Sequence, residues 1–434
     1  MNANKLPITH SANFWIILSI VAFLVLPSHA LDYGLFDSTA DEFFDAMGWS
    51  SFNITAFWFL PVILYGLLPW LKLSPNTQAK AELYLLVLAT LFTFISASVL
   101  KISMGYSVIV LLIAFTALAT LSLAKLKIMQ GDKFIIASLL CIVLLIFFFI
   151  VYPTLAIFVS MFYDGDTFAP QQVMRILTQS YIVRVISNSL FLSGFVGIVS
   201  TVFGLAFALY TTRIARRTAF IGKIFSILPI VTPPFVVGLG VTLMLGRSGY
   251  VTEFLSTNFG FTNHNWLYGF NGIAIAQILA FAPISFMILD GALKSVHPSI
   301  EEASYTLRAN RYQTFYNIIF PLLRPALANS FLIVFIQSLA DFSNPLVLGG
   351  SFDVIATQIY FYIAGSQLDY ASASTLVSML LIFSLAIFII QYLWIGNHSY
   401  VTVSGKSYRG DVQELPTGLK YTIIFMLGSW VIFN

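Results

Sequence analysis

Residues 297–325 read HPSIEEASYTLRANRYQTFYNIIFPLLRP. This stretch carries charged and polar side chains, whereas the sequence on both sides of it is strongly apolar. Charged side chains avoid the hydrocarbon interior of a membrane, so the stretch must lie outside the bilayer, between two spans. Its length and polarity indicate a segment that is presented to water or to a partner.

The composition places the rest of the chain in a membrane. The 434 residues are 59% hydrophobic and 9% charged, whereas a soluble domain carries roughly 25% charged residues. We therefore expect an all-α, polytopic helix bundle. The net charge of +3 gives no indication of nucleic-acid binding. The single cysteine, Cys141, cannot form an internal disulfide, and we expect neither a metal site nor a cofactor.

Apolar runs define the expected spans, because a helix needs about 20 such residues to cross the bilayer. The first run contains Phe14–Pro27 and is expected to remain uncleaved, since only Lys5 precedes it and many spans follow. A last run, 420–434, is short, so we expect about 10–11 spans. The ten full runs lie near 13–30, 54–71, 82–100, 104–124, 134–160, 184–212, 219–246, 270–293, 326–348 and 374–396.

The distribution of basic residues fixes the orientation. With the N-terminus inside, 17 of the 21 Lys and Arg residues fall in inner segments, and only Lys101, Arg175, Arg184 and Arg247 fall outside. This is the asymmetry that the positive-inside rule requires. We therefore expect a cytoplasmic N-terminus and a cytoplasmic 297–325 segment in a cell inner membrane.

The cytoplasmic segment is expected to form two helices. Ser299 and Glu302 have the spacing of a capping box, which predicts a helix from about Ile300 to Ala309. Asn310 is the expected left-handed stop. A second helix should then end near Pro321 or Pro325.

This predicted hairpin has two interpretations on physical grounds alone. It can be an amphipathic element that packs beneath the bundle at the membrane surface. It can also be a helix that is presented to a groove on a partner protein. The sequence itself favours neither.

The spacing of several residues in this segment resembles the EAA loop of the membrane subunits of type I ABC importers, whose core is MetI-like. The matching residues are Glu302-Ala303-Ser304, Leu307, Ala309-Asn310, Ile319-Phe320-Pro321-Leu322-Leu323 and Pro325. The resemblance implies a coupling helix that docks into a separate ATP-binding subunit. The implied coupling residues are Ser299, Glu301, Glu302, Ala303, Leu307, Arg308, Asn310 and Pro321.

Arg308 departs from the family pattern, which has glycine at this position. A left-handed backbone is unfavourable for arginine. We therefore expect Asn310 to make the turn instead.

Three other stretches resemble the ferric-iron-type (FbpB-like) subgroup, namely 230–240, 340–360 and 401–406. Members of this subgroup commonly fuse two permease halves with two coupling loops, whereas this sequence has one loop. We therefore hypothesise a truncated chain that needs a second permease half or copy. The expected parts are extra N-terminal helices (1–160), an outer loop (161–183), the permease core (184–396) and a connector with the start of a second half (397–434).

Polar and helix-breaking residues inside the spans are candidates for the translocation pathway, because such residues are costly in lipid and usually face the bundle interior. They also have a structural interpretation, as hydrogen bonds between helices or as close packing through small residues. The candidates are Pro233, Pro234, Gly238, Gly240, Gln337, Asp341 and Asn344.

The sequence contains no phosphate-binding Gly-x-x-x-x-Gly-Lys-Ser/Thr loop, so the ATPase must be a separate subunit and the chain itself is not expected to be an enzyme. The resemblance implies a periplasmic binding protein that delivers the substrate, which is ferric iron for this subgroup. A small anion such as a sugar phosphate remains open, as do an ion-coupled carrier and an inactive remnant.

Overall fold

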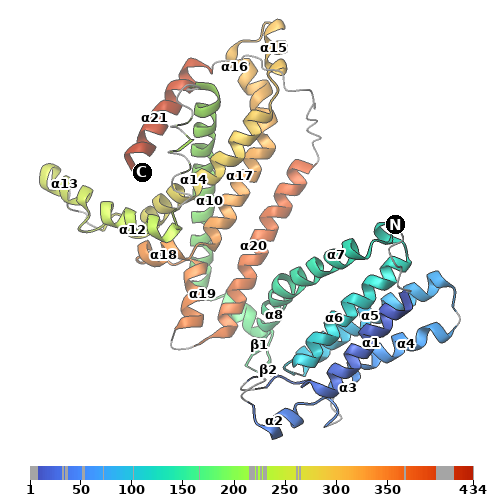
Figure 1. Ribbon diagram of the computed structural model, residues 1–434. Helices are drawn as coiled ribbons and strands as arrows, with labels where there is room; N and C mark the ends of the chain where they lie inside the picture. Colours follow the sequence, from blue (N-terminus) through green and yellow to red (C-terminus); the bar gives the residue numbers. More distant parts are fainter. Residues whose placement is uncertain are drawn as a thin grey trace. The chain divides into compact units, whose positions relative to one another are not determined.

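The computed structural model describes residues 8–31, 34, 38–50, 54–71, 73–100, 102–165, 167–214, 220, 223–224, 227, 232–260, 262, 265–365, 368–396 and 415–433. In these residues the only sheet is a two-stranded hairpin, and the other elements are helices (Figure 1). Eight of the described helices are long and apolar enough to cross a membrane. The expected polytopic, all-α membrane fold is confirmed. These eight are Pro75–Val99, Tyr106–Lys125, Lys133–Ser160, Ser180–Ile214, Pro234–Phe259, Phe270–Ser295, Arg311–Ala340 and Tyr370–Leu393.

The chain divides into two compact units, Met1–Thr154 and Leu155–Asn434. In the first unit α1, α4, α5 and α6 pack around a core that contains the fully buried Trp58. The Trp58 indole Nε1 donates to Ser96 Oγ on α5 over 2.7 Å. The elements are α1 Ile8–Val25, α2 Ala40–Asp45, α3 Ile54–Phe57, α4 Leu60–Leu67, η1 Leu68–Leu71, α5 Pro75–Val99, α6 Tyr106–Lys125, η2 Ile128–Gly131, α7 Lys133–Ile146, η3 Phe147–Val151 and the start of α8 Tyr152–Ser160.

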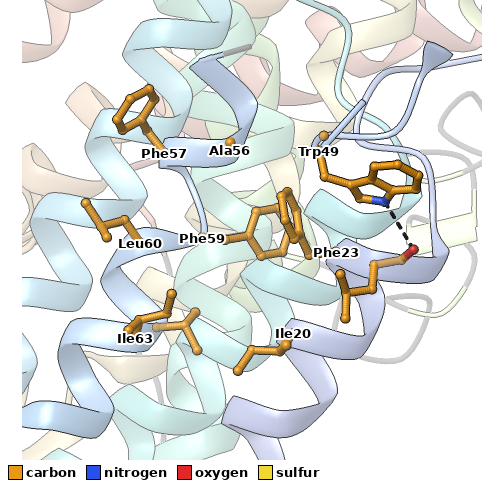
Figure 2. A pocket seen from close by; sticks show the side chains of 11 residues that line it. Ile20, Phe23, Trp49, Ala56, Phe57, Phe59, Leu60 and Ile63 are labelled. Atoms are coloured by element: carbon orange, nitrogen blue, oxygen red, sulfur yellow. Dashed lines mark hydrogen bonds between the residues drawn. The ribbon is translucent and has the colours of Figure 1, made fainter. Parts of the chain in front are cut away.

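The first unit contains an apolar cavity of about 480 Å³ beside α1 and α4 (Figure 2). Phe23 and Phe59 contact each other in its wall, with ring centroids 4.6 Å apart. Trp49 Nε1 donates to the Leu24 carbonyl over 3.3 Å. The side chains of the lining are hydrophobic, so this cavity suits hydrocarbon chains rather than ions.

In the second unit α14 is the central helix, and α10 and α17 pack against it (Figure 1). The elements are β1 Tyr163–Asp164, β2 Thr167–Phe168, α9 Gln171–Leu177, α10 Ser180–Leu209, η4 Tyr210–Ile214, α12 Pro234–Leu245, α13 Tyr250–Phe259, α14 Phe270–Ser295, α15 Pro298–Thr306, α16 Arg311–Thr314, η5 Phe315–Ile319, α17 Phe320–Ala340, α18 Ser343–Leu348, α19 Ile355–Ala364, α20 Tyr370–Gly396 and α21 Thr417–Phe433. The strands β1 and β2 are antiparallel and pair Tyr163 with Phe168.

Small residues allow these central helices to approach closely. A side chain at Gly204 on α10 would overlap Ser285 on α14. A Cβ at Gly197 would lie 2.9 Å from the Phe331 ring on α17. Such contacts drive helix association in lipid, where the hydrophobic effect between helices is absent. These close contacts hold α10, α14 and α17 together, and the polar residues described below lie on or next to these helices.

Several span boundaries differ from the expectation, because helices end at positions that an apolar average does not detect. The expected 326–348 span is a helix over Arg311–Ala340, followed by a break at Asp341 and the short α18. The expected 54–71 span is divided into α3, α4 and η1. Most of 215–231 and all of 397–414 lie outside the described residues, so the start of the 219–246 span and the 401–406 connector are not described.

Candidate functional site: the helical hairpin and the polar cluster

The 297–325 segment forms a helical hairpin between α14 and α17 (Figure 1). Its first helix, α15, begins at Pro298, and the N-cap is His297, whose Nδ1 accepts from the Ser299 amide over 3.3 Å. The expected capping box of Ser299 and Glu302 is therefore wrong. The helix starts earlier because proline at its first position needs no hydrogen-bond acceptor and has a helical φ.

The turn of the hairpin is made by Arg308, which has a φ of +62°. Its amide donates to the Tyr305 carbonyl over 2.8 Å, and the Ala309 amide donates to the Ser304 carbonyl over 3.1 Å, which closes the end of α15. The expectation that Asn310 adopts the left-handed conformation is wrong. Asn310 has an extended backbone and forms a capping box with Gln313 at the start of α16.

The buried face of α15 is anchored to the end of α10 by an ion pair. Arg213 in η4 donates from Nη1 and Nη2 to the two carboxylate oxygens of Glu301, over 2.7 and 2.6 Å. The two side chains are only 4% and 2% exposed. A second buried contact joins Ser304 Oγ to Thr314 Oγ1 over 2.8 Å and holds α15 against α16. Glu301 is thus turned toward the bundle rather than outward.

The opposite face of α15 is exposed. Leu307 is 84% exposed, and Glu302, Ala303 and Thr306 are also exposed. An exposed leucine contributes no hydrophobic stabilisation to the fold. Together, Leu307, Ala303 and Glu302 form a small apolar patch with a polar edge, which is the composition of a protein–protein contact surface. Ser299, Arg308 and Asn310 are exposed as well, whereas Pro321 is half-buried at the start of α17.

The helix that follows the turn continues further than expected. It runs through Pro321 and Pro325 to Ala340 instead of ending at either proline. A π-helical turn, η5, ends at Ile319, two residues before Pro321. Such a turn shifts the hydrogen-bond register, which accommodates a proline that lacks an amide hydrogen.

A second polar contact connects η4 to α14. Thr211 Oγ1 donates to Asp290 Oδ1 over 3.3 Å, and Lys294 forms an ion pair with Asp290 one turn along α14. Together with the ion pair of Arg213 and Glu301, this contact joins the end of α10 to the segment that leads into the hairpin. η4 is also a π-helical turn, a feature that is frequent at functional sites.

A separate polar cluster surrounds Asp341, at the break that follows α17. Asp341 Oδ2 accepts from Asn344 Nδ2 over 2.7 Å and from Gln277 Nε2 over 2.9 Å. Its other oxygen, Oδ1, accepts from the Ser343 amide over 3.0 Å. Ser338 Oγ donates to Gln277 Oε1 over 2.7 Å. Three N–H groups therefore donate to this carboxylate.

The predicted pathway residues Gly238 and Asn344 meet in this cluster. A Cβ at Gly238 would lie 2.6 Å from Asn344 Oδ1, so only glycine permits this contact between α12 and α18. Asn344 is fully buried, and its Oδ1 is without a hydrogen-bond partner among the described residues. An unsatisfied buried amide oxygen costs about 1–3 kcal/mol.

The other four predicted pathway residues do not take part in this contact. Pro233 is the N-cap of α12, which begins at Pro234, and both prolines are exposed. Gly240 has open space where a side chain would be. Gln337 is exposed, one turn before Asp341. The structure thus brings Gly238, Asp341 and Asn344 together, but not the remaining four.

Sequence reasoning missed Gln277, Ser338 and Arg213. Gln277 is a lone amide in the apolar run of α14 and is fully buried, which is a detectable signal. Its partner could not be identified, because Asp341 lies 64 residues away in the chain. In the described parts of the chain, no group of three or more His, Cys, Asp or Glu residues is arranged to hold a metal ion.

The helix bundle of the second unit agrees with the fold that the resemblance to type I ABC importers implies. Residues 200–395 match the family described as "Binding-protein-dependent transport system inner membrane component". A bacterial ABC transporter "involved in the import of the acidic polysaccharide alginate" shares the fold, with a TM-score of 0.54 and 20% identity over 61% of this chain and 97% of that one.

Two ferric transport permeases of the FbpB type are similar to most of the chain. It is 83% identical over 431 residues to the ferric transport system permease protein FbpB of Actinobacillus pleuropneumoniae, covering 99% of this chain and 63% of that protein. It is 91% identical over 388 residues to FbpB 1 of Haemophilus influenzae, covering 89% of this chain and 61% of that protein. The chain therefore spans about three fifths of the length of these relatives.

Proposed function

We propose that the chain is the membrane permease of an ABC importer for ferric iron, driven by a separate ATP-binding subunit that docks on the hairpin. The observation that carries this proposal is the two-sided character of α15. One face is exposed and centred on Leu307, and the other is anchored to the bundle through Glu301. A docking element needs both a contact surface and a rigid attachment.

The attachment supplies a route for the mechanical step. Because the ion pair of Arg213 and Glu301 is bidentate and buried, a displacement of α15 must move the end of α10 with it. α10 packs along α14 and α17, which carry Gln277 and the residues leading to Asp341. A movement of α15 caused by closure of an ATPase dimer would thereby be transmitted through α10 to the polar cluster around Asp341.

The substrate proposal rests on the two FbpB relatives and on the chemistry of Asp341. A carboxylate beside a helix break offers oxygen atoms, which suit a hard cation better than an anion. A small anion is the second candidate, because the sulfate transport system permease protein CysT of Escherichia coli is 29% identical over 217 residues. The much higher identity to the FbpB proteins favours iron.

The proposal includes the partners that this class requires. A periplasmic binding protein would deliver the substrate from the outer side, and a second permease half or copy would complete the pathway. The N-terminus and the hairpin would both face the cytoplasm of a cell with an inner membrane, as the positions of the basic residues predict.

Leu307→Asp tests the docking role. Burying a new carboxylate in an apolar contact should weaken binding of the ATP-binding subunit about 30-fold, the effect of a lost interface residue worth about 2 kcal/mol. Co-purification of the subunit from membranes measures this. Leu73→Asp is the matched control, because Leu73 is exposed on the same expected side but lies outside the hairpin. Equal retention of the subunit by both variants would contradict the proposal.

A further inference from the structure

The first unit contains a polar cavity that lies outside the family match, which begins at residue 200. The cavity has a volume of about 710 Å³ and opens between α1, the end of α4 with η1, the start of α5 and the end of α6. Ile16 and Pro69 belong to its apolar wall, and Lys125 and Lys127 belong to its polar wall. It is thus amphipathic, in contrast to the apolar cavity of Figure 2.

A buried carboxylate organises the polar wall. Glu82 is fully buried, and both its oxygens accept from Lys125 Nζ, over 2.8 and 2.7 Å. Gln78 Nε2 donates to Glu82 Oε1 over 2.8 Å, and Ser122 Oγ donates to Oε2 over 2.9 Å. Tyr65 OH also donates to Oε2, over 3.2 Å. These bonds occupy the acceptor positions of Glu82, so this carboxylate is not available to bind a cation.

The same bonds leave the cavity with a surplus of positive charge. The Lys125 side chain remains 27% exposed, and an ammonium group has three N–H donors, of which Glu82 takes two. Lys127 also lines the cavity and is exposed. Two lysines against one glutamate give the lining a net charge of +1. The first residues of α5 line it too, with the positive end of the helix dipole.

We propose that this cavity binds a phosphate group, and that its source is the headgroup of an anionic phospholipid. The Lys125 and Lys127 ammonium groups would contact the phosphate oxygens, and the wall with Ile16 and Pro69 would contact the glycerol and the first methylenes. Basic pockets between spans on the cytoplasmic side are the usual sites for anionic headgroups. Free inorganic phosphate has the same oxygen chemistry but would leave the apolar wall without a contact.

The position of the cavity supports the lipid source. Lys125 ends a helix long and apolar enough to cross a membrane, so we expect the lysines to lie near the depth of the headgroups. The segment from Lys125 to Lys133 is one of those that the charge distribution predicts to be cytoplasmic. The volume lies within the usual range of about 300–1,000 Å³ for small-molecule sites.

The test is native mass spectrometry of the full chain in detergent, titrated with dioleoylphosphatidylglycerol or with dioleoylphosphatidylcholine. We expect tighter binding of the anionic lipid and a loss of roughly fivefold in Lys127→Gln, the effect of one lysine near an anionic lipid. Lys133→Gln is the matched control, because Lys133 is exposed in the same unit but does not line the cavity. An equal loss in both variants, or no loss in either, would overturn the proposal.

A second variant and a second ligand complete the test. Lys125→Gln alone leaves Glu82 buried and unpaired, so the double variant Glu82→Gln with Lys125→Gln removes the cavity ammonium while preserving a neutral hydrogen-bonded pair. This variant should weaken binding of the anionic lipid, because the direct contact of Lys125 with the phosphate is lost although the net charge of the lining stays +1. Inorganic phosphate is the second ligand. Binding that depends on Lys127 for inorganic phosphate, but not for the anionic lipid, would overturn the lipid source.

Discussion

The turn of the hairpin requires a left-handed backbone at a single residue, Arg308. Its φ of +62° lies in the left-handed region, which costs a residue with a Cβ about 1 kcal/mol. The family pattern has glycine here, where the cost is absent. Because Asn310 caps α16 with its side chain, it cannot also make the left-handed turn. Arg308 therefore adopts the unfavourable conformation, which sets the direction of α16 relative to α15.

The close contact between Gly238 and Asn344 can be tested with a single substitution. Gly238→Ala would place a methyl group 2.6 Å from Asn344 Oδ1, so α12 or the Asn344 side chain must shift. We expect ferric iron uptake to fall at least tenfold, while the protein level in the membrane and the bound ATP-binding subunit stay unchanged. Radiolabelled iron uptake by cells measures this.

Gly240→Ala is the control for this experiment, because Gly240 lies on the same helix with open space at its Cβ position. It should leave uptake close to that of the unmodified chain. If the two substitutions reduce uptake equally, the contact between Gly238 and Asn344 has no special role and helix propensity alone is responsible.

At the scale of the element, α15 is tied to α10 by an ion pair that the primary structure does not reveal. Glu301 lies in the polar segment 297–325, but its partner Arg213 is 88 positions away. Removing one partner of a buried pair leaves an unpaired charge and costs about 3–5 kcal/mol. The pair therefore offers a test of mechanical coupling.

Glu301→Arg and Arg213→Glu, made separately, should abolish uptake, and the double exchange should restore part of it. The quantity to measure is iron transported per ATP hydrolysed in proteoliposomes, together with membrane abundance. Lys294→Gln breaks the more exposed pair with Asp290 and should change this ratio by less than about twofold. A double exchange that remains as defective as the single variants, in a stably inserted protein, would show that the pair does not transmit motion.

The elements that could be predicted are those with a strong local signal. The hairpin is visible in the sequence because 297–325 is polar between apolar runs, whereas the burial of Glu301 could not be read from it. The caps were missed because several polar residues compete for each helix start, and His297 and Asn310 were chosen by the local geometry. The partner of Asp341 was missed because Gln277 approaches it only in the folded bundle.

At the scale of the whole molecule, hydropathy predicts a membrane bundle but not where its helices break. The break at Asp341 and the division of 54–71 depend on tertiary contacts and on polar side chains that an average over 20 residues conceals. The two units differ in the functional features that they contain. The second carries the family match and the hairpin, and the first carries the cavity with Lys125 and Lys127.

The central claim is that the hairpin receives the ATP-binding subunit, and site-directed cross-linking tests it most directly. In a Cys141→Ala background the chain has no cysteine, so Leu307→Cys introduces a single thiol on the exposed face of α15. Asn258→Cys, exposed on α13 at the opposite expected side, is the control. With a short thiol-to-amine reagent in membranes, we predict an adduct with the ATP-binding subunit at position 307 and none at 258. A complex that forms normally but yields no adduct at position 307 would contradict the account.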